Sequence, residues 1–244
     1  MLSTESLPAV QQALADAGLD AWLLFDFQGS NPIAGGVLGL NGMVTRRIFA
    51  FIPRTGLPVA ITHNIEQGPW RDWPKEWRRE RYSTWKVLEE IVASLVRGKR
   101  GAMEYSPGDA VPYVDRGPAG VLDLVRGAGA EVVPSAELVP RFYALWTSGQ
   151  LASHLRAAEI VATVARDGLA LAGSKAAAGE PLTEHALQHW IIERFERASL
   201  EFDHPAIVAA GANAADPHYA PSSSRPHTIA PGEILLIDLW AKEH

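Results

Sequence analysis

The segment from residue 203 to residue 244 constrains the fold most, because it holds two short apolar runs on either side of a long turn-rich loop. Residues 205–210 are apolar and bounded by proline and glycine, which predicts a buried strand. Residues 211–226 are rich in turn formers and predict a loop. The pair Pro231-Gly232 predicts a turn that leads into a second apolar strand over residues 233–241.

Asp238 interrupts the second of these strands. Side chains alternate along a strand, and both faces of this one carry apolar neighbours of Asp238. We therefore expect the carboxylate to be largely enclosed, which is costly unless a cation or strong hydrogen bonds meet it. This favours a metal ligand, a partner of Arg or Lys, or a carboxyl with a raised pKa. An aspartate at a strand end that reaches solvent is the alternative.

Composition bounds the class of protein. A chain of 244 residues suggests one large or two ordinary domains, and 47% hydrophobic with 20% charged residues is typical of a globular protein. The net charge of -6 argues against general binding to nucleic acid or anionic membranes. The chain has no cysteine, which excludes disulfides and thiolate zinc sites. No leader-like or membrane-length apolar run is seen, so we expect a cytoplasmic protein.

Strand and helix patterns alternate over residues 1–148, which predicts an α/β domain with a mixed sheet. Within it, residues 29–42 read as a glycine-rich loop. Its glycines do not form G-x-G-x-x-G and no clear helix follows, so a dinucleotide site is not indicated.

Residues 70–82 interleave three tryptophans with basic side chains. This pattern is compatible with single-stranded nucleic acid, with a protein interface, or with a solvated amphipathic loop anchored by its tryptophans. Acidic residues in the same stretch and the acidic chain weigh against nucleic acid.

A domain boundary is expected at residues 147–149, followed by a long Ala-rich helix over residues 150–176. The spacing of its apolar residues predicts a buried side made of Leu151, Leu155, Ala158, Val161, Ala165 and Ala172. Thr183 begins the next helix, on which His185, His189 and Glu193 share one face. Two histidines one turn apart can bind zinc, but the glutamate of H-E-x-x-H is missing, and a solvated polar face explains these residues more simply.

Two motifs within residues 203–244 resemble those of a known protein family. The patterns G-x-N-A-A-x-x-H-Y (residues 211–219) and P-G-E-x-L-L-I-D (residues 231–238) resemble the creatinase / Xaa-Pro peptidase group of the pita-bread metallopeptidases. The stretch K-x-x-x-G-E-P-L-T-E before the second helix is also similar. The resemblance implies that Asp238 is the first ligand of a centre of two divalent metals, commonly manganese, cobalt or zinc. It implies that His218 contacts substrate and stabilises the developing charge.

The sequence departs from the family pattern after Asp238. The family centre also needs a second aspartate about a dozen residues further on, then a histidine and two glutamates. Only six residues follow Asp238 here, so one ligand of five is present. We therefore expect an incomplete pita-bread domain over residues 149–244, truncated after its first metal-ligand motif, that binds no metal cofactor and is inactive alone as an Xaa-Pro peptidase.

A half pita-bread domain would leave its strands without a partner sheet. This predicts a homodimer or higher oligomer. The alternative function is a non-catalytic module, derived from the family, that binds peptides or mediates assembly.

Overall fold

The computed structural model describes residues 1–135 and 137–243 of the chain. The chain forms two compact units, unit 1 (Met1–Leu145) and unit 2 (Trp146–His244). The sequence-based division falls between residues 148 and 149, and the last residue of the second domain expected there, 244, lies outside the described residues. Within those residues, no helix is long and apolar enough to cross a membrane.

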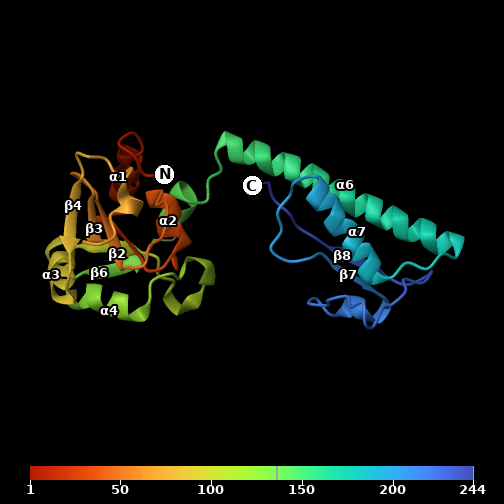
Figure 1. The fold of residues 1–244 in the computed structure, drawn as a ribbon. Helices are drawn as coiled ribbons and strands as arrows, with labels where there is room; N and C mark the ends of the chain where they lie inside the picture. Colours follow the sequence, from red (N-terminus) through yellow and green to blue (C-terminus); the bar gives the residue numbers. More distant parts are fainter. Residues whose placement is uncertain (136, 244) are drawn as a thin grey trace. The chain divides into compact units, whose positions relative to one another are not determined.

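Unit 1 is built on a mixed sheet of six strands in the order β4-β3-β2-β1-β5-β6 (Figure 1). The pairs β1–β2 and β2–β3 are antiparallel, whereas β1–β5, β5–β6 and β3–β4 are parallel. The mixed α/β sheet predicted from the sequence is therefore confirmed. The strands are β1 (Ala21–Asp26), β2 (Ile48–Pro53), β3 (Val59–His63), β4 (Arg78–Tyr82), β5 (Arg100–Met103) and β6 (Glu131–Pro134).

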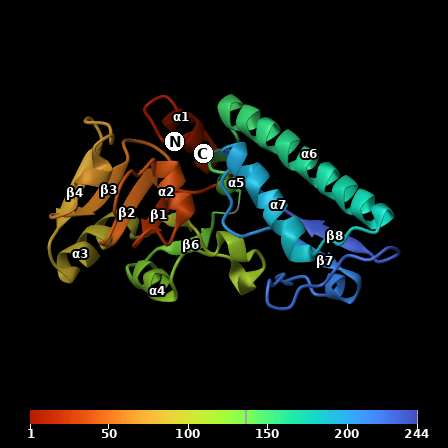
Figure 2. The same ribbon diagram turned by 45° about the vertical axis from the view of Figure 1, so that its right-hand side comes forward.

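Helices cover both faces of this sheet, so its central strands are buried on both sides. Along β1, Trp22 and Leu24 enter one core while Leu23 and Phe25 enter the other, as alternation requires. The first core is closed by α1 (Leu7–Asp16), α2 (Pro32–Leu38) and α5 (Leu138–Phe142). The second is closed by α3 (Trp85–Val96) and α4 (Ala119–Gly127), seen together on one side of the sheet in Figure 2. Short 3-10 turns complete the unit: η1 (Gly68–Trp70), η2 (Pro107–Asp109) and η3 (Pro112–Val114).

The glycine-rich stretch 29–42 is not the continuous loop expected from the sequence, because it contains α2. The side chain of Asn31 caps this helix by accepting hydrogen bonds from the N–H groups of Ile33 and Ala34, both at 3.1 Å. Pro32 follows at the first helical position, where its missing N–H costs nothing. Gly39 ends the helix with φ of 64°, so the cap and stop signals outweigh the low helix propensity of two internal glycines.

The three tryptophans of residues 70–82 belong to the core. Trp70, Trp73 and Trp77 are buried, and their rings stack edge to face with centroids 5.2 and 4.9 Å apart. The Arg79 guanidinium donates to the carbonyl of Trp70 at 2.7 Å, which fixes the entry into β4. The tryptophans are therefore anchors of unit 1, and their faces are occupied by packing.

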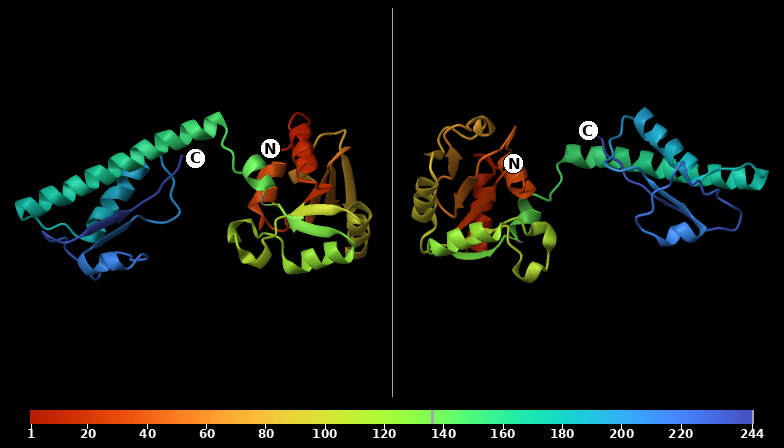
Figure 3. Two further views of the ribbon diagram at one scale, coloured as in Figure 1. Left: turned by 180° about the vertical axis from the view of Figure 1, so that it is seen from behind. Right: turned by 60° about the horizontal axis from the view of Figure 1, so that its bottom comes forward.

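Unit 2 consists of two helices packed on a two-stranded antiparallel sheet. It comprises α6 (Ser148–Ala178), α7 (Glu184–Arg197), β7 (Ile207–Ala210), the 3-10 turn η4 (Gly211–Ala215) and β8 (Leu235–Asp238). Figure 3 shows the long helix α6 from two further sides. Thr147 and Gln150 form a reciprocal capping box at the start of α6, and Thr183 caps α7 through the N–H of Ala186.

The buried side of α6 agrees with the prediction only in part. Ala172 is buried as predicted, and Val161 and Ala165 are half-buried. Leu151 and Leu155 are 46% and 59% exposed and Ala158 is exposed, whereas Ala157, Val164 and Gly168 are buried instead. At Gly168 an added Cβ would lie 3.5 to 3.7 Å from Ile237, Leu187 and Trp190. Small residues therefore form the face of α6 that packs against α7 and β8. Leu151 and Leu155, near the start of the helix, are not part of this face.

Glu104, directly after β5, is a buried carboxylate in unit 1. The indole N–H of Trp22 donates to it at 2.7 Å and the Asn31 amide at 3.0 Å. Burial raises the pKa of Glu104 to about 7, because these hydrogen bonds only partly offset the loss of hydration. The same Asn31 caps α2, so this carboxylate links β1, β5 and the start of α2.

We expect unit 1 to lose stability as the pH rises. The folded-state pKa of Glu104, about 7, exceeds the ordinary value of 4.5, so the folded state binds more protons between these values. The contribution of Glu104 to the unfolding free energy is complete below pH 4.5. It declines by about 3 kcal/mol as the pH rises from 4.5 through 7. Urea unfolding followed by tryptophan fluorescence measures this slope, and Glu104→Gln should flatten it.

The matched control is Glu131→Gln, which alters an exposed glutamate on β6 paired with Arg100 at 3.0 Å. It should keep the parental slope. An unchanged slope in Glu104→Gln would contradict the assignment of this pH dependence to Glu104.

Candidate functional site

The strand that ends in Asp238 forms as predicted, but its aspartate is not enclosed. β8 pairs with β7 in the register Ile207↔Asp238 to Ala210↔Leu235. Leu235, Leu236 and Ile237 are half-buried and Asp238 is exposed. The expectation of an enclosed carboxylate is wrong for the described residues, because the β7–β8 sheet has two strands and leaves this end of β8 uncovered.

His218 lies in the loop that follows η4. Its backbone N–H donates to the Asp216 carboxylate at 2.9 Å, a turn typical of aspartate in loops, and its side chain is exposed. The loop leaves the end of β7 at Ala210, whereas Asp238 pairs with the opposite end of that strand at Ile207. No hydrogen bond or ion pair joins His218 to Asp238 in the described ranges.

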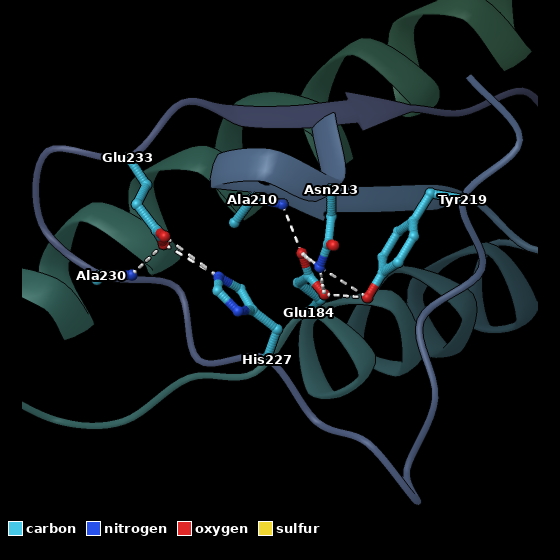
Figure 4. A network of polar contacts seen from close by, with 7 residues as sticks. All are labelled: Glu184, Ala210, Asn213, Tyr219, His227, Ala230 and Glu233. Carbon is cyan, nitrogen blue, oxygen red and sulfur yellow. Dashed lines mark hydrogen bonds and ion pairs between the residues drawn. The ribbon is translucent and has the colours of Figure 1, made fainter. Parts of the chain in front are cut away.

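A buried carboxylate, Glu184, fixes the same loop (Figure 4). It is 1% exposed and occupies the first position of α7. Three donors meet it: the backbone N–H of Ala210 at 2.5 Å, the Asn213 amide at 3.1 and 3.2 Å, and the Tyr219 hydroxyl at 2.6 Å. The Asn213 amide also donates to the Tyr219 oxygen at 3.0 Å. We call Glu184, Asn213 and Tyr219 the Glu184 clamp.

Electrostatics explains how this carboxylate is accommodated without a cationic partner in the clamp. Three donors satisfy its oxygens, and the N-terminal end of α7 supplies a favourable dipole. The hydrogen bond to Glu184 raises the pKa of the Tyr219 hydroxyl, and burial adds to the effect. The clamp therefore keeps a neutral Tyr219 donating to the carboxylate.

A second polar contact closes the other end of the loop. His227 Nε2 lies 3.2 and 3.3 Å from the two oxygens of Glu233, which also accepts from the N–H of Ala230 at 2.9 Å. This backbone donor lowers the pKa of Glu233, with desolvation opposing it and His227 adding to it. An added Cβ at Gly211, whose φ is +55°, would lie 2.5 Å from the Glu233 carboxylate, so glycine permits the close approach.

The two polar groups are joined through the backbone. The N–H of Glu184 donates to the carbonyl of His227 at 3.1 Å, and the N–H of Ile229 donates to the carbonyl of Leu182 at 2.9 Å. The start of α7 and the segment before β8 thus run side by side, with an antiparallel bridge between Thr183 and Thr228.

Sequence reasoning did not assign Glu184, Asn213 or Tyr219 a role. All three stand in the motifs that carried the family resemblance: Glu184 ends the K-x-x-x-G-E-P-L-T-E stretch, and the other two lie in G-x-N-A-A-x-x-H-Y. The available signal was a glutamate directly after a helix-capping threonine, 34 residues before His218. Their contact is long-range, so no local periodicity reveals it.

Metal-ligating residues do not gather into a complete centre in residues 1–135 and 137–243. No three His, Asp or Glu side chains there could hold one ion together. Asp238 therefore stands as a single carboxylate, and the described residues do not fit a two-metal centre by themselves.

Comparison with known proteins agrees with the motifs. Residues 153–244 match the pattern of metallopeptidase family M24. Among curated proteins, no match is found.

Solved structures share the fold over nearly the whole chain. Prolidase from Thermococcus sibiricus has 21% identity and a TM-score of 0.62, with 100% of this chain and 62% of that one covered. The Xaa-Pro dipeptidase of Bacillus anthracis has 18% identity and a TM-score of 0.61, with 97% and 60% covered. Aminopeptidase P of Escherichia coli has 14% identity and a TM-score of 0.54, with 98% and 59% covered.

The chain thus spans about 62% of the length of the prolidase it resembles. Unit 2 carries both the family match and the motif residues. Residues 153–244 thus match the model of metallopeptidase family M24, and the chain shares its fold with solved prolidases and Xaa-Pro dipeptidases.

Proposed function

We propose that this chain supplies part of the active site of a metal-dependent peptidase that cleaves a peptide bond next to proline. The observation that supports this most is the Glu184 clamp. It places a buried carboxylate beneath the H-Y motif and holds Tyr219, the neighbour of His218, at 2.6 Å. A loop used only as a connection has no need for an ion buried at this cost.

In this proposal His218 acts on the substrate. Its side chain is exposed on the anchored loop, where an imidazole can donate a hydrogen bond to a carbonyl oxygen. Charge that develops on such an oxygen during peptide hydrolysis is stabilised by a donor held in place beforehand. Anchoring by Asn213 and Tyr219 provides that order on both sides of His218.

Asp238 is the proposed metal ligand. Its exposure leaves both carboxylate oxygens open to an ion, and its position at the end of β8 is set by pairing with Ile207. Divalent metals in such sites polarise the scissile carbonyl and lower the pKa of the attacking water. One carboxylate does not hold two ions, so the proposal requires ligands from outside the described residues.

Residues 1–244 alone should therefore show no metal-dependent cleavage of an Xaa-Pro dipeptide. The assay supplies manganese, cobalt or zinc and follows the release of proline. Hydrolysis by this chain that disappears in Asp238→Asn would overturn the proposed inactivity.

The same assay is then made on a longer polypeptide that also supplies the further carboxylate and histidine ligands. There, Asp238→Asn should abolish turnover, and His218→Ala should lower kcat by about 100- to 1000-fold, the cost of losing one preorganised donor. Normal turnover in both variants would refute the roles proposed for these residues.

The clamp is tested by Glu184→Gln. A neutral amide loses the charge-assisted bonds and leaves one donor facing another, so unit 2 should lose about 1–3 kcal/mol of unfolding free energy. The pKa of Tyr219, raised by Glu184, should fall back toward its usual value in a spectrophotometric titration. Glu180→Gln, an exposed glutamate paired with Lys175, is the control and should leave both readouts unchanged. An unshifted tyrosine titration in Glu184→Gln would contradict the clamp.

A second candidate function is assembly without catalysis. It is supported by apolar side chains that unit 2 leaves in solvent: Ile234 is 75% exposed, Trp240 is 42% exposed, and the leucines at the start of α6 are exposed as well. An uncovered strand and apolar side chains of this kind favour association into a homodimer or higher oligomer. A peptide is the alternative occupant of the same region.

Light scattering tests this assembly. The chain should be dimeric or larger, and Ile234→Glu should shift it toward the monomer, whereas Val111→Glu, at a 48% exposed site in unit 1, should not. A stable monomer that binds no hydrophobic dye would exclude the assembly function.

A further inference from the structure

Two histidines on α7 bring their ring nitrogens together. His185 and His189 are one helical turn apart, and their Nε2 atoms are separated by 3.1 Å, with ring centroids 4.4 Å apart. His185 is half-buried and His189 is exposed, so the pair is open to solvent. In this state one Nε2 donates its hydrogen to the lone pair of the other.

This separation matches that of two nitrogens bound to one metal ion. Zinc binds imidazole nitrogen at about 2.0–2.1 Å, so two such nitrogens at tetrahedral or right-angled positions lie about 2.9–3.4 Å apart. The observed 3.1 Å falls within this range. An ion placed between the rings would replace the shared hydrogen without a change of helix geometry.

We propose that His185 and His189 form a bidentate site for a divalent transition metal of the zinc, nickel and copper class. Imidazole nitrogen suits these ions, whereas magnesium and calcium prefer oxygen ligands. Water completes the coordination, because no third His, Asp or Glu side chain in the described ranges joins the pair. On the next turn Glu193 is paired with Arg197 at 3.3 Å and takes no part.

The convergence of the rings goes beyond what a solvated polar face requires. Side chains on such a face are free to extend into water, whereas here both imidazoles turn toward each other through the same nitrogen. The site is separate from Asp238 and His218, and it would remain if the proposed peptidase function were wrong. A bound metal ion would link the first and second turns of α7, the helix whose first residue is Glu184.

Calorimetric titration of the untagged chain with zinc chloride at neutral pH tests the site. We expect one zinc ion to bind, and His185→Ala or His189→Ala to weaken it by at least about tenfold, because each removes one arm of a chelate. The matched control His154→Ala alters an exposed helix histidine whose ring centroid lies 4.5 Å from that of Trp146, and it should keep full affinity. Asp238→Asn should also keep it, which separates this site from the proposed catalytic one.

Nuclear magnetic resonance of the imidazole nitrogens identifies the ligands directly. Zinc should shift the Nε2 signals of His185 and His189 and leave those of His154 in place, and magnesium should shift neither. Equal zinc affinity in the parent and both alanine variants, or zinc-induced shifts confined to other histidines, would overturn the proposal.

Discussion

A buried carboxylate with no ion-pair partner among the described residues organises unit 2. Glu184 is held by donors from a strand end, an amide and a phenol, and each donor belongs to the segment that carries the H-Y motif. Removing any of them would leave a buried charge poorly satisfied, so the positions of Ala210, Asn213 and Tyr219 are mutually dependent. The start of α7, the end of β7 and the loop with Asn213 and Tyr219 are therefore positioned together by Glu184.

Unit 1 uses a buried carboxylate in a different way. Glu104 has two side-chain donors, Trp22 and Asn31, and its pKa moves up to about 7, which is the response expected when hydrogen bonds do not fully replace hydration. Glu184, by contrast, has a backbone donor and a helix terminus besides its side-chain donors. The two buried glutamates thus differ in the kind of donor that meets them.

Much of the fold follows from local pattern. Alternating strands and helices predicted the mixed sheet of unit 1, and the two apolar runs predicted β7 and β8. The failures are also physical. The buried side of α6 was predicted to include Leu151 and Leu155, but these leucines are exposed, and close packing against α7 and β8 selects small residues around Gly168. Asp238 was expected inside because apolar neighbours suggest burial, whereas burial depends on what covers the sheet. The Glu184 clamp joins Glu184 to residues 29 and 35 positions away, a separation beyond the reach of periodicity.

The bridge between Thr183 and Thr228 has a consequence for how unit 2 folds. It closes a chain loop of more than forty residues that contains α7, β7 and the motif loop, and such closure costs entropy before any contact forms. Contacts between residues this far apart in the sequence slow folding, because the entropy of loop closure is lost before stabilising contacts form. Because the N–H of Glu184 bonds to the carbonyl of His227 beside this bridge, the same closure places the start of α7 next to the segment that leads into β8. The helix that begins at Glu184 and the strand that ends in Asp238 are thus brought together by one long-range closure.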